Sequence, residues 1–147
     1  MSRHGYSEDG WDDQESQWAS IRWAGQVRSA IRGKRGQAFL VALVEALDSL
    51  PEKRLIAESL QDEGEVCALG ALGRHRGIDM RGLDPEDSVA IGETFGIARQ
   101  LACEVMYQND ENSLSPEERW RFVRAWALRQ INPETLVPED VERQGDL

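Results

Sequence analysis

The chain has few residues that could carry redox or metal chemistry. Among its 147 residues are two cysteines, Cys67 and Cys103, and two histidines, His4 and His75. The cysteines are too few for a secreted disulfide scaffold and too far apart for a Cys-x-x-Cys redox motif. Nor do these four residues have the ligand spacing of a zinc site. We therefore expect reduced thiols, no bound metal and no cofactor.

Long apolar runs and a basic charge are also missing. No stretch approaches the roughly 20 apolar residues that span a bilayer, and residues 1–7 lack the apolar core of a secretion signal. The 17 Lys and Arg residues are outnumbered by 27 Asp and Glu, for a net charge of -10. Such a charge disfavours broad capture of nucleic acid or anionic lipid. These features predict a cytoplasmic protein with no membrane partner.

What is present is a helical pattern over most of the chain. Apolar residues recur at helical spacing over residues 14–131, whereas residues 1–13 and 132–147 are polar, acidic and without a period. We predict a flexible acidic N-terminal arm, a helical globular domain and an acidic C-terminal tail. The fold class is mainly α, a compact single-domain bundle of about five to six helices. A short β-hairpin near residues 55–67 is compatible with the acidic-glycine turn there.

Local signals place the helix ends. We expect helices over residues 14–32, 37–50, 66–76, 85–94, 97–108 and 116–131. Asp84 and Pro85 form a predicted helix start, as does the capping box at Ser115. The second helix is apolar around most of its circumference, so we expect it at the centre. The first and last helices are expected to pack on each other.

Glycines in the third predicted helix need an explanation, because each costs roughly 1 kcal/mol relative to alanine. At about 100° per residue, Val66, Gly70, Gly73 and Gly77 fall on one stripe. We interpret Gly70, Gly73 and Gly77 as a packing groove that admits another backbone. A groove for a ligand or partner is the alternative. Gly77 also stands where a left-handed residue would end the helix.

Cys67 begins this helix, where the dipole and the free amide groups stabilise a thiolate. A nucleophilic cysteine needs a base, but His75 lies about 12 Å farther along the same helix. His4 belongs to the expected arm, which leaves Asn109 and Asp110 as supporting residues. A thiol-dependent hydrolase or transferase using Cys67, Asn109 and Asp110 is therefore one hypothesis. A small buried thiol is the simpler interpretation.

Tryptophan is frequent, with five residues in the chain. Trp120 fits the inner stripe of the last helix, whereas Trp126 and Phe122 lie on another face. Trp18 and Arg22 also fall outside the core stripe of the first helix. Aromatic and arginine side chains are typical of binding hot spots. We predict a partner-binding surface built from Trp18, Arg22, Phe122 and Trp126.

Two parts of the sequence carry a resemblance. The segment Cys-Ala-Leu-Gly-Ala-Leu at residues 67–72, followed some forty residues later by Asn109 and Asp110, resembles a pattern in uncharacterised small phage and prophage proteins. Residues 17–23 and 31–40 are similar to hypothetical proteins of the same kind. The likeness runs over residues 17–131 and implies no activity and no catalytic residue. It implies a bacterial host cell and a host protein, including a defence protein, as the partner.

These observations give one leading hypothesis and two alternatives. The leading one is a non-enzymatic protein-binding module, a phage-encoded modulator or inhibitor of a host defence protein, such as an anti-CRISPR-like or other counter-defence factor. Its acidic surface could imitate nucleic acid towards a basic nucleic-acid-binding channel. The first alternative is the Cys67 enzyme. The second is a small nucleic-acid-binding protein that uses the basic segment 28–35, with Arg28, Arg32, Lys34 and Arg35.

Overall fold

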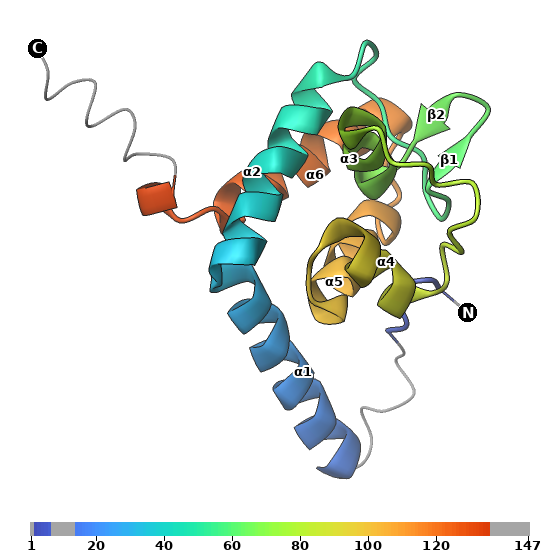
Figure 1. Ribbon diagram of the computed structural model, residues 1–147. Coiled ribbons are helices and arrows are strands. Elements are labelled where there is room, and N and C mark those ends of the chain that lie inside the picture. Colours follow the sequence, from blue (N-terminus) through green and yellow to red (C-terminus); the bar gives the residue numbers. More distant parts are fainter. Residues whose placement is uncertain (1, 7–13, 136–147) are drawn as a thin grey trace, which may run out of the picture.

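The computed structural model describes residues 2–6 and 14–135, which form a mainly helical structure (Figure 1). In chain order the elements are α1 (Gln14–Arg32), α2 (Lys34–Ser49), β1 (Gln61–Asp62), β2 (Glu65–Val66), α3 (Ala68–Arg76), α4 (Ser88–Phe95), α5 (Arg99–Asp110) and α6 (Pro116–Gln130). A short helical turn at residues 133–135 follows α6. The predicted fold class is confirmed, hairpin included. Among the described helices, none combines the length and apolar character needed to cross a bilayer.

The second helix is well buried, in keeping with its apolar sequence, but it lies along one side of the molecule and not at its centre as expected (Figure 1). Phe39, Leu40, Leu43 and Leu47 of α2 are buried, and α2 packs against α1, α3 and α6. Such burial stabilises the fold by roughly 1.5–3 kcal/mol for each large apolar side chain. The opposite side of α2, with Ala38, Glu45 and Asp48, is exposed, and α5, which packs against α1, α3, α4 and α6, is the more central helix.

A buried amide joins the ends of three helices. Gln37, near the start of α2, donates from Nε2 to the carbonyl oxygens of Ile31 (2.7 Å) and Gln130 (3.0 Å). Its Oε1 accepts from the backbone N–H of Asn132 at 2.8 Å. Buried polar groups are costly unless they are hydrogen-bonded. Gln37 therefore positions the carboxyl ends of α1 and α6 beside the start of α2.

Helix ends follow the local signals in most places. Gly77 and Gly96 end α3 and α4 with left-handed φ values of 71° and 69°, a conformation that favours glycine. Ser115 and Glu118 form the predicted capping box at the start of α6. Ends of this kind are specified by three or four consecutive residues, which is why the sequence predicts them.

The start of α4 differs from the prediction. Asp84 does not cap the helix, because its carboxylate accepts from the backbone N–H of Glu86 at 2.9 Å. That bond closes a local turn of the kind aspartate favours. The cap is Asp87, which accepts from the N–H of Ala90 at 3.0 Å. The helix thus begins three residues later than Pro85 suggests.

The hairpin and α3 form one continuous unit. Strands β1 and β2 are antiparallel with Gln61 opposite Val66. The turn between them has positive φ at Glu63 (50°) and Gly64 (84°), as a two-residue hairpin turn of primed type requires. The chain then enters α3 directly at Cys67. The hairpin therefore positions the amino end of α3.

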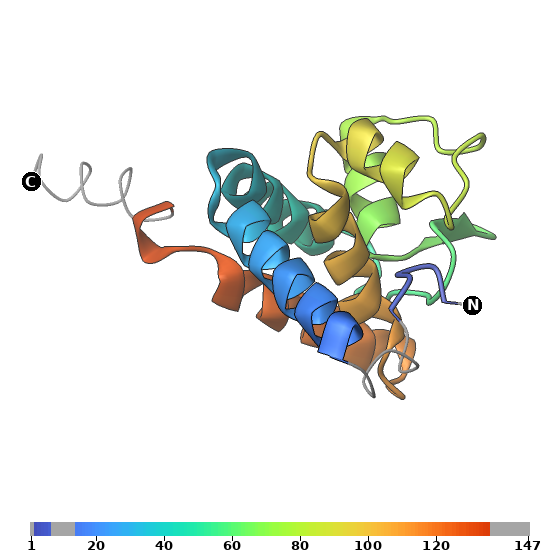
Figure 2. The same ribbon diagram turned by 90° about the horizontal axis from the view of Figure 1, so that it is seen from below.

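The first and last helices meet at their carboxyl ends, where Gln37 bonds to the carbonyl oxygens of both Ile31 and Gln130, but they pack mainly on other helices and not along their lengths. Helix α1 packs on α5 and α2, and α6 packs on α2 and α5. Only Val27 and Ile31 of α1 are buried, and its first half projects past α5 (Figures 1 and 2). Away from those ends, α5 packs against both α1 and α6. This arrangement opens the space described next.

Candidate functional site

The start of the chain lies against the helical domain instead of forming a free arm. Arg3 and His4 are only 6% and 3% exposed, and residues 2–6 contact the carboxyl half of α5. This differs from the expected flexible arm over residues 1–13, because charged and aromatic side chains of the segment find partners on α5. Residue 1 and residues 7–13 lie outside the described residues, as does the predicted tail from residue 136 onwards.

Arg3 forms a two-pronged ion pair with Asp110. Its Nε lies 2.5 Å from Oδ2 and its Nη2 lies 2.7 Å from Oδ1, while Nη1 donates to the Cys67 sulfur at 3.6 Å. Burial would raise the pKa of Asp110, but the hydrogen bonds and charge of Arg3 outweigh it and hold that pKa below its usual range. Burial would likewise lower the pKa of Arg3, yet its interactions with Cys67 and Asp110 raise it. The pair therefore stays ionised.

The three residues of the thiol hypothesis do come together, but each has another structural role. Cys67 is fully buried and its sulfur accepts from the N–H of Gly70 at 3.4 Å. Asn109 accepts from the N–H of Ala68 at 3.0 Å. Its amide also donates to Asp110 Oδ1 at 2.8 Å. We refer to Arg3, Cys67, Asn109 and Asp110 as the Cys67 cluster. His75, the other base considered, is exposed.

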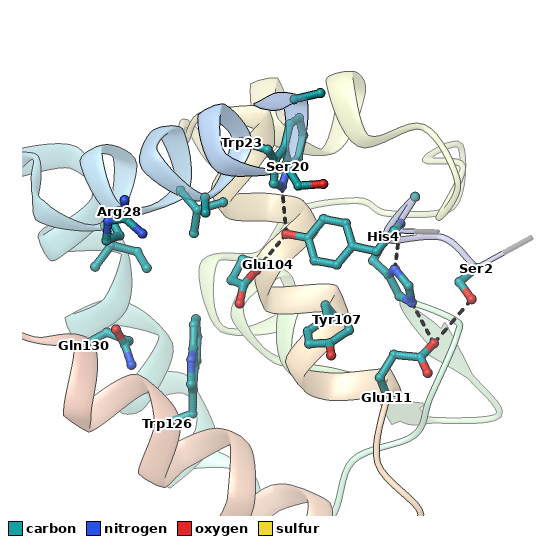
Figure 3. A pocket seen from close by; sticks show the side chains of 16 residues that line it. Ser2, His4, Ser20, Trp23, Arg28, Glu104, Tyr107, Glu111, Trp126 and Gln130 are labelled. Atoms are coloured by element: carbon teal, nitrogen blue, oxygen red, sulfur yellow. Dashed lines mark hydrogen bonds and ion pairs between the residues drawn. The ribbon is translucent and has the colours of Figure 1, made fainter. Parts of the chain in front are cut away.

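His4 and Tyr6 continue the attachment of the N-terminal segment (Figure 3). His4 Nδ1 accepts from the N–H of Tyr6 at 3.0 Å, so Nε2 carries the proton that it shares with Glu111 at 2.6 Å. The Tyr6 hydroxyl donates to Glu104 at 2.7 Å and accepts from Trp23 Nε1 at 3.1 Å. Burial raises the pKa of Tyr6. These bonds tie residues 2–6 to both α5 and α1.

Beside this segment lies a groove of about 1430 Å³ between α1 and α6 (Figure 3). Helix α5 forms its floor and residues 2–6 form one wall. We refer to it as the α1–α6 groove. Its apolar and aromatic lining comes from three helices and includes Ala19, Trp23, Val27, Ile31, Tyr107 and Trp126. A surface of this kind loses contact with water when a partner covers it, which favours association.

The charges of the groove are divided between its two ends. Arg28 of α1 lies at one end beside Gln130, whereas Glu104 of α5 and Glu111, which directly follows α5, lie towards the other (Figure 3). The Glu111 side chain is 45% exposed. The groove therefore has a basic end and an acidic end.

The four predicted partner-binding residues have different environments. Trp18 is 54% exposed and Arg22 is exposed, both on the projecting half of α1. Phe122 is 37% exposed on α6, but Trp126 is only 6% exposed. The Trp126 side chain points into the α1–α6 groove (Figure 3). Trp126 is thus part of the groove lining, and the expectation that it stands on an exposed face is corrected by its burial against neighbouring helices.

The glycines of α3 have different surroundings from one another. A methyl group at Gly70 would overlap the carbonyl oxygen of Leu60, and one at Gly73 would overlap the Met80 sulfur. The backbone that approaches Gly70 belongs to the chain entering β1, not to another helix. At Gly77 no atom lies within 4 Å of such a methyl group. Gly77 is therefore needed for its left-handed backbone, not for close packing.

The remaining candidates lie on the surface. Arg28, Arg32, Lys34 and Arg35 are all exposed around the junction of α1 and α2. In residues 2–6 and 14–135, no group of three His, Cys, Asp or Glu side chains is arranged to hold a metal ion.

Sequence reasoning missed the N-terminal residues altogether. Arg3, His4 and Tyr6 are among the best-connected polar side chains of the described structure, yet they have no periodic pattern. The one sequence feature that indicates their attachment is chemical. Arg3, His4 and Tyr6 are side chains that can pair with the acidic residues near Asp110. Comparison with protein-family models, curated proteins and solved structures finds no match to this chain.

Proposed function

We propose that this chain is a non-enzymatic protein-binding module, encoded by a phage or prophage, which modulates or inhibits a host protein in the bacterial cytoplasm. A host defence protein is the preferred target, in keeping with the phage-like segments of the sequence. The binding surface is the α1–α6 groove. Trp18 and Arg22 do not line the groove; they are exposed on another face of the projecting part of α1 and could form a separate contact.

The observation that carries this proposal is the groove itself. At about 1430 Å³ it exceeds the usual 300–1000 Å³ of a small-molecule pocket. Its lining combines aromatic and aliphatic residues with polar and charged ones, among them Arg28. Aromatic side chains and arginine are the residue types that dominate binding energy at protein interfaces. A folded segment of another protein matches such a surface better than a metabolite does.

The Cys67 cluster supports the non-enzymatic assignment. Asp110 is paired with Arg3, and Asn109 is engaged by the backbone of α3 and by Asp110. Neither is positioned to take a proton from Cys67, whose side chain is fully buried. An activated thiol needs an adjacent base and access to substrate.

Site-specific photocrosslinking tests the proposal. p-Benzoylphenylalanine would replace Ala24, which lines the groove and is exposed, or Val89 of α4, which is 54% exposed and does not line it. In the bacterium that encodes the chain, we expect one host protein to be captured from position 24 and not from position 89. Capture of the same proteins from both positions, or of none from position 24, would count against the groove.

A thiol-dependent enzyme remains the second candidate, because two N–H donors, from Arg3 and Gly70, point at the Cys67 sulfur. Such donors stabilise a thiolate. Iodoacetamide labelling at neutral pH is the direct test. A Cys67 that reacts no faster than a free thiol removes this candidate.

Nucleic-acid binding is the third candidate, and the shared exposure of Arg28, Arg32, Lys34 and Arg35 favours it. Contacts of this type weaken steeply with salt. The absence of a gel shift at low salt would end this hypothesis.

A further inference from the structure

The α1–α6 groove has the dimensions and charge distribution suited to one short helix. We propose that its occupant is an amphipathic helix of about three turns, supplied by a partner protein and lying along α1 with its amino end beside Glu104 and Glu111. The inference rests on the proposed binding function. It adds the conformation and the direction of the bound segment.

The size of the groove fits this occupant. The lining residues of α1 run from Ala19 to Ile31, a length of about 18 Å along a helix axis. A helix of this length and about 10 Å in diameter has a volume on the order of 1400 Å³. The groove offers about 1430 Å³. Three turns of helix thus match the groove in length and in the order of magnitude of its volume.

The α1 wall presents a ridge of the kind that helices pack against. Ala19, Trp23, Val27 and Ile31 follow one another at intervals of four residues, a spacing at which rows of side chains fit into the grooves of a neighbouring helix. Val27 and Ile31 are only 8% and 9% exposed, so a guest helix would contact this row mainly at Ala19 and Trp23. Ala24, which also lines the groove, is small. Small side chains allow the close approach of another helix axis, at about 8–10 Å.

Across the groove, Trp126 of α6 lines the opposite wall with the small part of its side chain, 6%, that is exposed (Figure 3). A guest helix would contact both walls at once with one apolar stripe, while its polar side faces water. This is the arrangement by which amphipathic helices bind grooves.

The charges select the direction of the helix. A helix carries partial positive charge at its amino end and partial negative charge at its carboxyl end. Glu104 accepts hydrogen bonds from the neutral groups of Tyr6 and Gln108, so its negative charge is not cancelled. Together with Glu111 it attracts a helix amino end, and Arg28 at the opposite end attracts the carboxyl end.

A displayed library of fourteen-residue peptides tests the conformation. Peptides would be selected on the full chain and counter-selected on Ala24→Glu, which places a carboxylate on the groove wall. We expect the enriched sequences to carry apolar residues at helical spacing. Their dissociation constants should rise at least tenfold on Ala24→Glu and stay unchanged on Val89→Glu. Enrichment of alternating or proline-rich patterns would overturn the helix.

A spin label on the best peptide tests the direction, read by the loss of backbone amide NMR signals in the full chain. A label at the peptide amino end should broaden Tyr107 and Glu111, and one at the carboxyl end should broaden Arg28 and Gln130. The reverse pattern would overturn the assigned polarity.

The two proposals fail in different ways. If position 24 captures a host protein but no helical peptide is enriched, the binding function stands and the helix is wrong. The photocrosslink could instead join position 24 to residues 136–147 of the same chain or to a second copy of the chain. The proposal that a partner protein supplies the helix would then be wrong, because the groove would already be filled. If helical peptides are enriched but no host protein is captured, the proposed function fails on its own.

Discussion

The Cys67 cluster and the α1–α6 groove lie on opposite sides of residues 2–6 and differ in every physical respect. In the cluster, Arg3, Cys67, Asn109 and Asp110 satisfy one another's hydrogen bonds away from water. In the groove, apolar residues such as Trp23 and Tyr107 line an open volume together with the titratable His4, Glu104 and Glu111. The residues of the Cys67 cluster are thus used for structure, whereas the groove is the part of the surface that we propose for binding.

The largest expected effect comes from breaking the cluster at its centre. Asp110→Ala removes the partner of Arg3 and the acceptor of the Glu58 N–H, which lies 3.0 Å away. We expect the free energy of unfolding to fall by about 3 kcal/mol, because a buried charge loses its partner. Urea unfolding measures this. A loss below about 1 kcal/mol, the value typical of a surface pair, would show that the pair is not structural.

Arg3→Ala should have a smaller effect on stability, because Asp110 keeps the backbone N–H of Glu58 and the Asn109 amide as donors. We expect a loss of about 2 kcal/mol. The same change should free residues 2–6 and expose Cys67, raising its iodoacetamide rate at least tenfold. Arg28→Ala is the matched control, since it removes the same charge from the groove and should leave the rate unchanged. Equal iodoacetamide rates of Cys67 in Arg3→Ala and Arg28→Ala would contradict the interpretation that Arg3 shields Cys67 from solvent.

Acid should remove the contribution of the ion pair. The pKa of Asp110 is lowered in the folded protein below its ordinary 3.8, so its stabilising effect is complete above that value and is lost as pH falls through the folded pKa. The stability gap between the natural chain and Arg3→Ala should therefore be widest near pH 6 and shrink towards pH 2.5. Urea unfolding across this range measures it. The gap for Arg28→Ala should stay flat, and a parallel narrowing would contradict the assignment to Asp110.

A region of the structure can be predicted from the sequence when its contacts join residues that are close together in the chain. The Ser115 box and the Gly77 and Gly96 ends depend on neighbouring residues, and all three were predictable. The Arg3–Asp110 pair joins residues 107 positions apart. No spacing rule reaches that far, so residues 2–6 looked like an unstructured arm.

The groove was only partly predictable for a similar reason. Periodicity separates Trp120 from Trp126 on α6, but it does not say which face meets another helix. That depends on how α5 packs against α1 and α6, which is a property of the whole fold. The excess of tryptophan predicts a binding surface, whereas the proposal that the groove is that surface depends on the three-dimensional arrangement.

Ala24→Glu is expected to change stability least. It is also the most direct test of the contrast between the Cys67 cluster and the α1–α6 groove. Ala24→Glu changes an exposed position on the groove wall, where substitutions usually alter stability by less than about 0.5 kcal/mol. We expect urea unfolding and the iodoacetamide rate of Cys67 to match those of the natural chain. Capture of the partner from a benzoylphenylalanine at Ser20, which also lines the groove, should nevertheless be lost. A large loss of stability from Ala24→Glu would mean that the groove wall is part of the core.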